Sequence, residues 1–316
     1  MAGNTSFDEI LTTTLNNYVP KLVDNVFSAR PLFYALTNSS TMRTVSGGAK
    51  IVVPIIYKAN TTAKSYAGTE TIDIAAQTGI TAAEYSWGQY ASTVTINGLE
   101  EAQNNGEAQI IDLLEGKIFQ TQESIIENMN TMFHGDGTTK ATDWNGLENI
   151  VNDSALTANA LGGIDPSVTG NAFWKSQATT TTGALTLAKL ATRYNSVSVG
   201  NDQPTIIISK ADDYESYEAL LTSNIRYTDT DMADAGFQNL MYKGAPWTFD
   251  AANADGVIYM LNTKYLQMVR HSDTWFKPTP FVRPTNQDAV FSQILCYGQL
   301  TCSNRARQGY LEGVTA

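Results

Sequence analysis

The stretch from residue 107 to residue 134 has the strongest pattern in the sequence. Asn104-Asn105-Gly106 precedes it and Gly135 follows it, which predicts where a helix begins and ends. A helix of this span is about 40 Å long at 1.5 Å per residue, more than twice the usual length. The rest of the chain must therefore be built along it. The apolar stripe at helical spacing consists of Ile111, Leu114, Ile118, Ile125, Met129 and Met132.

Residues 132–151, MFHGDGTTKATDWNGLENIV, place three glycines and two aspartates directly after this helix. A phosphate-binding loop needs its glycines ahead of a helix, and a calcium loop needs alternating oxygen ligands and a glutamate twelve residues on. Neither order is present, so we expect a structural turn, with Gly135 as a left-handed cap and Asp136-Gly137 as a tight turn. His134 has no second histidine at metal-ligand spacing, so we expect it to serve at the helix end or in packing.

Charge and composition restrict the function. Charged residues are 16% of the chain, against about a quarter in ordinary proteins, which suits a protein that contacts neighbours but also an ordinary β-rich soluble protein. The net charge is −11; residues 264–316 hold six Lys and Arg against three Asp and Glu, so the rest carries −14. Such a chain is a poor candidate for tight nucleic-acid binding. It suits the wall of a container to which a packaged polymer must not stick.

The cysteines and the N-terminus indicate the compartment. Cys296 and Cys302 lie six residues apart in a strand-like run, about 20 Å at 3.3 Å per residue, so we expect them to be unpaired and reduced in a cytosolic setting. The N-terminal MAGNTSFDEILTTTL has neither the basic nor the apolar region of a signal peptide, and no apolar run approaches eighteen residues. We therefore expect a soluble chain made in the cytoplasm, with no membrane partner.

The first third of the chain predicts an arm and a long hairpin. Residues 1–46 are interrupted at Pro20 and Pro31 and have too few apolar residues to fold alone. GGAKIVVPIIYKA predicts a strand, and AAEYSWGQYASTVTI, residues 82–96, predicts a second strand that returns. The polar residues 60–79 between them make a tip of about twenty residues, long for a loop, which is either mobile or ordered by a partner.

The second half predicts an α/β unit. Residues 152–183 read as loops, and from residue 184 a short helix is followed by a buried strand at 205–209. The next helix is expected to open at Ser209, with Asp212 in capping-box spacing. Two further strands, VIYMLN and YLQMVR, and one long strand at residues 289–302 complete the pattern.

Sequence motifs of catalysis do not occur in the chain. It has no Gly-x-Ser-x-Gly elbow, His-Glu-x-x-His pair, Cys-x-x-Cys pair or Gly-x-Gly-x-x-Gly fingerprint. Asp229, Asp231 and Asp234 in RYTDTDMADAGF would make an acidic metal cluster, but a solvated loop explains them and no Gly or Glu stands at calcium-loop positions. We therefore expect no enzyme and assign no catalytic, cofactor-binding or metal-ligating residue.

The order of parts is an arm, a long hairpin, a very long helix, a Gly-Asp-Gly turn, an α/β insertion and a long closing strand. This order resembles the major capsid proteins of tailed bacteriophages, which have the HK-ninety-seven-type fold. The resemblance covers nearly the whole chain. The stretches that carry it are DNVFSARPLFYAL, HGDGTTKATDWNGLENIV, RYTDTDMADAGF and FKPTPFVRPTNQDAVFSQILCYGQLTCSNRARQG.

The resemblance implies an α+β fold with five parts. These are an N-arm at residues 1–46, an extended E-loop at 47–96, a P-domain with the spine helix and following loops at 97–183, an A-domain at 184–262, and the return strand of the P-domain with a C-terminal tail at 263–316. It implies a structural protein rather than an enzyme.

The resemblance also implies partners. The chain would form the pentamers and hexamers of an icosahedral head around double-stranded DNA, assembled in the host cytoplasm and present in the virion. Members that carry their own scaffold have a long helical segment ahead of the arm, and this chain starts almost at the arm. We therefore expect a separate scaffolding protein, or removal of a propeptide. A portal protein is a further partner, a decoration protein an optional one, and the DNA is contacted weakly and non-specifically. The alternatives are a protein-cargo nanocompartment shell of the same fold and a soluble cytosolic α+β enzyme.

Contacts between subunits are expected in the arm and the loop, at Leu22, Val26, Phe27, Leu32, Phe33, Lys58, Lys64, Tyr66, Glu70 and Asp73. Some members of the family join an E-loop lysine to an asparagine of a neighbour, and Lys58 and Lys64 are the two lysines of residues 58–79, toward the tip of the proposed loop. Such a bond needs a nearby carboxylate and an apolar pocket. The tip around Lys64 offers only small polar neighbours, so the expected shell is held by noncovalent contacts.

Overall fold

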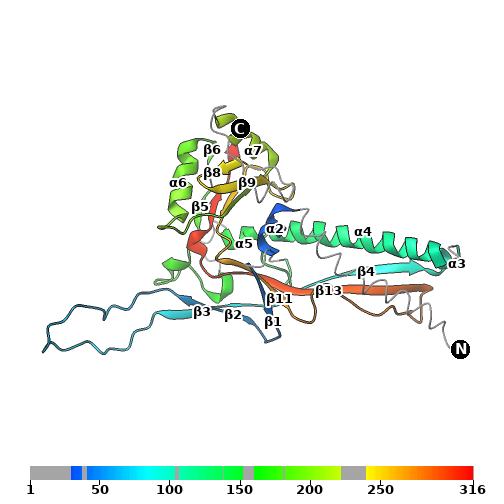
Figure 1. Cartoon of the computed structure of the whole chain (residues 1–316), viewed down its shortest axis with the longest axis horizontal. Helices are drawn as coiled ribbons and strands as arrows, with labels where there is room; N and C mark the ends of the chain where they lie inside the picture. The colour runs from blue at the N-terminus through cyan, green and yellow to red at the C-terminus, as the bar shows by residue number, and fades with distance from the viewer. Residues whose placement is uncertain are drawn as a thin grey trace.

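The computed structural model describes residues 30–37, 41–103, 107–137, 139–151, 160–180, 182–221 and 240–315, with the backbone alone at 101–103, 107–115 and 122. The molecule is elongated (Figure 1). A long helix and two long strands extend in one direction, a thin hairpin extends in the opposite direction, and a compact α/β domain lies above the point where they meet. The mixed α+β class predicted from the sequence is confirmed.

The long helix, α4, spans Glu107–His134, the bounds predicted from the sequence. A shorter helix, α3 (Gly98–Gln103), precedes it. Along the part whose side chains are described, Ile118, Ile125 and Met129 are buried as the stripe predicts. Met132 is only partly buried and Phe133 takes its place in the core. The helix therefore presents one apolar face to the sheet beneath it.

That sheet, the long sheet, is organised around β13 (Ala289–Cys302), again with the predicted bounds. On one side β13 pairs antiparallel with β4 (Gly88–Asn97) over ten residue pairs. On its other side it pairs with β11 (Leu266–His271) and then with β12 (Lys277–Pro278), and β1 (Met42–Val45) adds to β11 in parallel. The helix α4 runs along β4 (Figure 1).

The hairpin consists of β2 (Ile51–Ile56) and β3 (Ile80–Tyr85). The single returning strand predicted at residues 82–96 is wrong, because the chain makes two strands there that belong to different sheets. It changes sheets between β3 and β4, where Gly88 packs against Trp144 so closely that a Cβ on Gly88 would lie 1.9 Å from the Trp144 ring. This long-range contact is invisible in the local strand pattern.

The α/β domain contains a six-stranded sheet flanked by α6 (Leu187–Val197) and α7 (Ala211–Leu220). Two of its strands, β5 and β14, come from outside the range 184–262 expected for an A-domain. The strand order is β5 (Gln177–Thr179), β14 (Gly309–Leu311), β10 (Ile258–Leu261), β7 (Ile206–Ser209), β9 (Ala245–Phe249) and β8 (Leu240–Tyr242). Beside it lies a pair made by β6 (Gly183–Ala184) and β15 (Val314–Thr315).

The expected start of α7 at Ser209 is wrong. Lys210 is the residue ahead of the first turn, and no side chain caps the helix. Ser209 ends β7 instead, and its hydroxyl accepts a hydrogen bond from Trp247 Nε1 at 2.8 Å. A buried serine at a strand end thus satisfies an indole N–H of the neighbouring strand, and the capping-box spacing to Asp212 is not used.

The glycine-rich stretch after α4 is a structural turn, as predicted, but a different glycine adopts the left-handed conformation. That residue is Gly137, with φ of 65°, and not Gly135. The turn folds back on itself: a Cβ on Gly146 would lie 1.8 Å from the carbonyl oxygen of Gly135, and one on Gly137 would lie 2.1 Å from that of Trp144. These glycines allow the backbone of residues 135–137 to pack directly on the backbone of residues 144–146 at the end of α4.

Aromatic rings connect the parts around this turn. Phe33 of α2 (Pro31–Thr37) meets Phe133 of α4 edge-on, with ring centroids 4.9 Å apart. Phe133 meets Trp144 of the turn at 5.5 Å, and Trp144 stacks on Trp275, ahead of β12, at 5.9 Å. One apolar core is thus shared by α2, α4, the turn and the long sheet.

Buried polar groups hold the same region from the other side. Gln299 of β13 accepts from the Asn145 backbone N–H at 2.7 Å and donates to the Ser86 carbonyl at 3.0 Å. Arg305, after β13, donates to the Ile150 carbonyl at 2.9 Å, near the C-terminal end of the short helix α5 (Leu147–Val151). Cys296 and Cys302 are unpaired, as predicted, and burial raises the pKa of each thiol to about 12.

We predict that Gly146→Ala lowers the free energy of unfolding by about 1–3 kcal/mol, because the added methyl group meets backbone that cannot move aside. The matched control is Gly116→Ala. Gly116 lies in α4 with open space around the position of a Cβ, so this change should raise stability by about 0.5–1 kcal/mol. Urea unfolding of the two variants measures both values. Equal changes in the free energy of unfolding for the two variants would contradict close backbone packing at Gly146.

Candidate functional site

The hairpin reaches far beyond the body of the subunit (Figure 1). Its strands pair from Ile51 opposite Tyr85 to Ile56 opposite Ile80. One further backbone bond, from Tyr57 N–H to the Gly79 carbonyl at 3.0 Å, closes the ladder. Residues 58–79, here called the tip segment, continue outward without strand pairing. A two-stranded ribbon of this kind is only marginally stable by itself.

The paired part of the hairpin has two unlike faces. Ile51, Val53, Ile55, Ala83 and Tyr85 are buried against the body of the subunit. On the opposite face the alternate residues are also largely apolar but exposed to solvent: Ile56 is 80% exposed and Ile80 is 73% exposed, and Val52 and Pro54 share their face. Alternation along a half-buried strand ordinarily puts polar residues outside. This outer face departs from that rule, because it is largely apolar and uncovered in the single subunit.

The inner face is fixed to the body by three contacts. The Tyr85 hydroxyl donates to the Cys302 carbonyl at 2.7 Å and accepts from the Cys302 backbone N–H at 3.2 Å, and burial raises the pKa of this phenol. Tyr57 stacks on Phe173, with centroids 4.9 Å apart. Gly162, with φ of 64°, brings its backbone so close that a Cβ would lie 2.7 Å from that of Ala83. The base of the hairpin is therefore rigid, and its direction is set.

The tip segment contains an ion pair that the sequence reasoning missed. Lys64 Nζ lies 2.9 Å from Glu70 Oε1, and both side chains are close to half exposed. The hydrogen bond from Lys64, with a second from the Ala67 backbone N–H, lowers the pKa of Glu70. The expectation that Lys64 has only small polar neighbours is therefore wrong, because a carboxylate is in contact with its amine. The pair is open to solvent.

The tip segment also exposes two isoleucines. Ile74 is 94% exposed and Ile72 is 53% exposed, and one residue separates them along the chain. The description of residues 60–79 as polar is thus wrong at these two positions. The alternation in Thr71-Ile72-Asp73-Ile74 was the signal that could have shown it.

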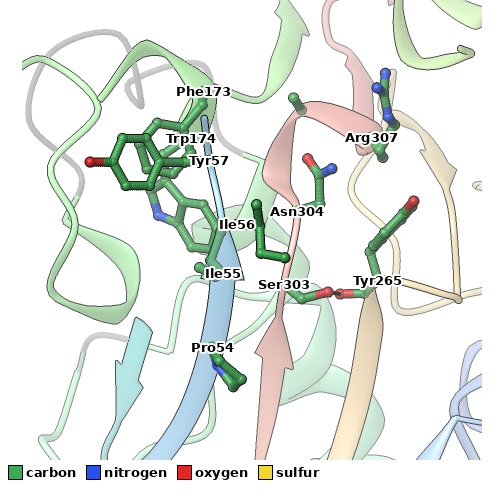
Figure 2. Close-up of a pocket in the computed structure, with 11 residues that line it drawn as sticks. Pro54, Ile55, Ile56, Tyr57, Phe173, Trp174, Tyr265, Ser303, Asn304 and Arg307 are labelled. Atoms are coloured by element: carbon green, nitrogen blue, oxygen red, sulfur yellow. Dashed lines mark hydrogen bonds between the residues drawn. The ribbon is translucent and has the colours of Figure 1, made fainter. Parts of the chain in front are cut away.

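A groove lies where the hairpin leaves the body (Figure 2). Its cavity volume is about 530 Å³. Ile56 at the end of β2 and Tyr57 after it line one side, and the neighbouring Phe173 and Trp174 add aromatic rings. The chain after β13 forms the opposite side with Asn304 and Arg307. The walls are largely apolar, with a few amide, hydroxyl and guanidinium groups among them. The groove and the outer face of the hairpin are continuous at Ile56.

The predicted contact residues fall into three groups. Leu22, Val26 and Phe27 lie outside the described residues. Leu32 and Phe33 are 0% and 1% exposed, because α2 packs into the subunit's own core, so their placement at a subunit contact is corrected. The remaining five lie on the hairpin and are exposed; their contact with a second subunit stays a prediction. These are Lys58, Lys64, Tyr66, Glu70 and Asp73.

Other candidate chemistry can be placed only in part. Asp229, Asp231 and Asp234 lie outside the described residues. Within the part of the chain that is described, no three His, Cys, Asp or Glu residues are grouped so that they could hold a metal ion. Within the same part, no helix combines the length and the apolar character needed to cross a bilayer. His134 lies buried at the end of α4, the place expected for it.

Comparison with known proteins decides the fold. No protein-family model matches the chain, and no curated protein sequence matches it. The capsid asymmetric unit of cyanophage A-1(L) aligns with 92% of this chain and 94% of its own, at 15% identity and a TM-score of 0.68. A structure from Mycobacterium phage Adephagia aligns with 89% of this chain and 90% of its own, at 10% identity and a TM-score of 0.54. The chain has the fold of tailed-phage capsid proteins.

The same fold occurs outside phages. The virus-like particle from Pyrococcus furiosus aligns with 92% of this chain and 96% of its own, at 12% identity and a TM-score of 0.51. In the terms of the capsid fold, α4 lies at the residues expected for the spine helix, and the hairpin with its tip segment lies within those expected for the E-loop. The assignment of the α/β domain as the A-domain stays a prediction. Because these sequence identities are only 10–15%, the comparisons establish the fold and not the function.

We predict that Tyr85→Phe lowers the free energy of unfolding by about 1–3 kcal/mol, because it removes both hydrogen bonds to Cys302 in a buried place. Tyr57→Phe is the control. Its hydroxyl makes one exposed bond, 3.4 Å long, to the Thr78 carbonyl, and the ring that stacks on Phe173 is kept, so the change should stay within about 0.5 kcal/mol. Urea unfolding measures both variants. If Tyr85→Phe left the free energy of unfolding unchanged, the two hydrogen bonds to Cys302 would not hold the hairpin to the body of the subunit.

Proposed function

We propose that this chain is a structural major capsid protein, which self-assembles into an icosahedral head that encloses a double-stranded DNA genome. The observation that supports this most directly is the E-loop hairpin, whose outer apolar face and isoleucine-bearing tip are uncovered in the single subunit. The fold shared with the cyanophage capsid supports the same function. In this proposal the hairpin is the arm by which one subunit holds the next.

An isolated two-stranded hairpin has no partner that covers its outer face. Two strands with one apolar face in water gain little stability alone, but they gain it when that face lies on an adjacent subunit. A contact between unlike surfaces of identical chains runs head to tail and closes into a ring when the rotation fits. Pentamers and hexamers are such rings. Each contact can be modest, because every subunit makes several at once.

The partners follow from the same proposal. A separate scaffolding protein directs assembly, a portal protein occupies one vertex, and a decoration protein is an optional addition. The particle is assembled in the host cytoplasm and ends in the virion. The acidic chain, with its net charge of −11, suits a wall that contacts packaged DNA weakly and without sequence preference.

A second candidate is a protein-cargo nanocompartment shell. The similarity to the virus-like particle from Pyrococcus furiosus favours it, because a shell of this fold exists there. The two candidates share the hairpin contact and differ in content. Particles purified after nuclease treatment should release long double-stranded DNA if the chain is a phage capsid protein. A defined protein cargo and no protected DNA would select the nanocompartment. An enzyme of α+β type would give neither particle.

We predict that Ile74→Asp, alone or with Ile56→Asp, abolishes assembly and leaves the subunit folded. Both side chains are exposed in the subunit, so a charge there costs little until the surface is buried by a neighbour. Light scattering and negative-stain microscopy measure assembly, and circular dichroism measures folding.

Val199→Asp is the matched control for this prediction. Val199 is also an exposed apolar residue, but it lies in the α/β domain after α6, away from the hairpin. This variant should form shells like the wild type. Wild-type yields of shells from Ile74→Asp and Ile56→Asp together would overturn the assigned role of the hairpin.

A further inference from the structure

The C-terminal end of α4 meets the α/β domain at a buried polar cluster. Its four members are Asn130 and His134 on the last turns of α4, and Asp250 and Asn253 in the segment that follows β9. All four are more than nine-tenths buried. Neither the hairpin contact nor the aromatic core uses them. They form a polar junction between the spine helix and the A-domain.

Asp250 is fixed in this junction by its backbone and by one carboxylate oxygen. Its N–H donates to the Ser209 carbonyl at 2.9 Å, and its carbonyl accepts from Asn253 N–H at 3.2 Å. Its Oδ1 accepts from Asn130 Nδ2 at 2.8 Å and from Ala252 N–H at 3.0 Å. The other oxygen, Oδ2, has no hydrogen-bond partner among the described residues. The carboxylate cannot turn toward a new donor without losing these bonds.

The neutral His134 ring turns a nitrogen without a proton, Nε2, toward the Asp250 carboxylate. Its Nδ1 lies 2.9 Å from the Asn130 carbonyl, so in the neutral ring Nδ1 carries the proton and donates it there. Nε2 then presents a lone pair. It lies 4.0 Å from Asp250 Oδ2 and has no hydrogen-bond partner among the described residues. Two acceptors therefore face each other, with no donor of the described chain between them.

Other charged groups near the end of α4 are engaged elsewhere. Glu127, nearly two turns before His134, pairs with Arg30 ahead of α2. Asp136, in the turn after the helix, acts on Glu148 of α5, whose pKa it raises together with burial. In the described part of the chain, Asp250 is thus the charged group that acts on the His134 ring.

We propose that His134 and Asp250 make this junction sensitive to protons, so that uptake of a proton by His134 loosens the contact between the end of α4 and residues 250–253. A charged imidazole needs its acceptor at about 2.7–2.9 Å. The distance of 4.0 Å is too long, and shortening it would pull Asp250 away from Asn130 and Ala252. The charged ring is satisfied more readily by water, which requires the junction to open.

The sign of the effect follows from burial. Burial lowers the pKa of His134, against smaller opposing effects of the Asp250 carboxylate and the Asn130 carbonyl. A histidine whose pKa is lower in the folded chain than in the unfolded chain favours folding while it is neutral. Its contribution is fully present above the unfolded pKa of about 6.5 and is lost as the pH falls through the folded pKa. The junction is therefore closed at neutral pH and loosens in acid.

Hydrogen exchange of the full chain at about pH 7.5 and about pH 5, corrected for the intrinsic pH dependence of exchange, tests this directly. The variants are His134→Gln and His271→Gln, which replace the only two histidines in the chain. His271 lies in the long sheet, at the end of β11. In the wild type and in His271→Gln, protection of residues 130–134 and 250–257 should fall about tenfold or more in acid. In His134→Gln it should stay constant, because a glutamine amide takes up no proton.

Two results would overturn the proposal: an acid response in His134→Gln equal to that of the wild type, or a wild type whose protection is the same at both pH values. If His134→Gln does not fold, nuclear magnetic resonance titration of the wild type decides. With two histidine rings to assign, the His134 titration must coincide with amide shifts at residues 250–253. Titration of His134 without those shifts would contradict the coupling.

Discussion

The antiparallel pairing of β13 with β4 is the interaction on which the rest of the subunit depends. It runs unbroken from Ala289 opposite Asn97 to Gly298 opposite Gly88. Side chains alternate along both strands, so a slip of one residue would turn Val94 and its neighbours from the core to solvent. The helix α4 packs on β4, the hairpin leaves from the start of β4, and the chain after β13 enters the α/β domain. One register therefore sets the place of every other part.

The sequence predicted well those elements whose signal is local and long. The bounds of α4 and β13 follow from apolar periodicity sustained over many residues and from glycine and asparagine at the helix ends. The failures involve contacts between distant residues. Nothing local in residues 82–96 shows that Gly88 must fit against Trp144 and that the chain changes sheets there. Likewise, an apolar stripe at Leu32 and Phe33 does not tell whether the subunit or its neighbour buries it.

The sequence predicted where the hairpin and its tip lie in the chain, but it did not predict which side chains contact one another there. A long polar hairpin tip was evident in the sequence. Because most of its residues are polar, the two exposed isoleucines, Ile72 and Ile74, were overlooked. The pair of Lys64 with Glu70 and the facing of His134 and Asp250 depend on how the backbone folds, so spacing alone could not show them. The domain limits expected from the capsid resemblance also stay a prediction, since β5 and β14 join the A-domain sheet from outside residues 184–262.

In the proposed shell, the tip segment, residues 58–79, is completed by a neighbouring subunit. Hydrogen exchange of that segment in free subunits and in assembled shells tests it most directly. We expect rapid exchange in the free subunit and exchange slowed by at least about tenfold in the shell, while residues 118–133 of α4 stay equally protected in both. Equal protection of residues 58–79 in the two states would contradict the account, because it would show a hairpin that needs no neighbour.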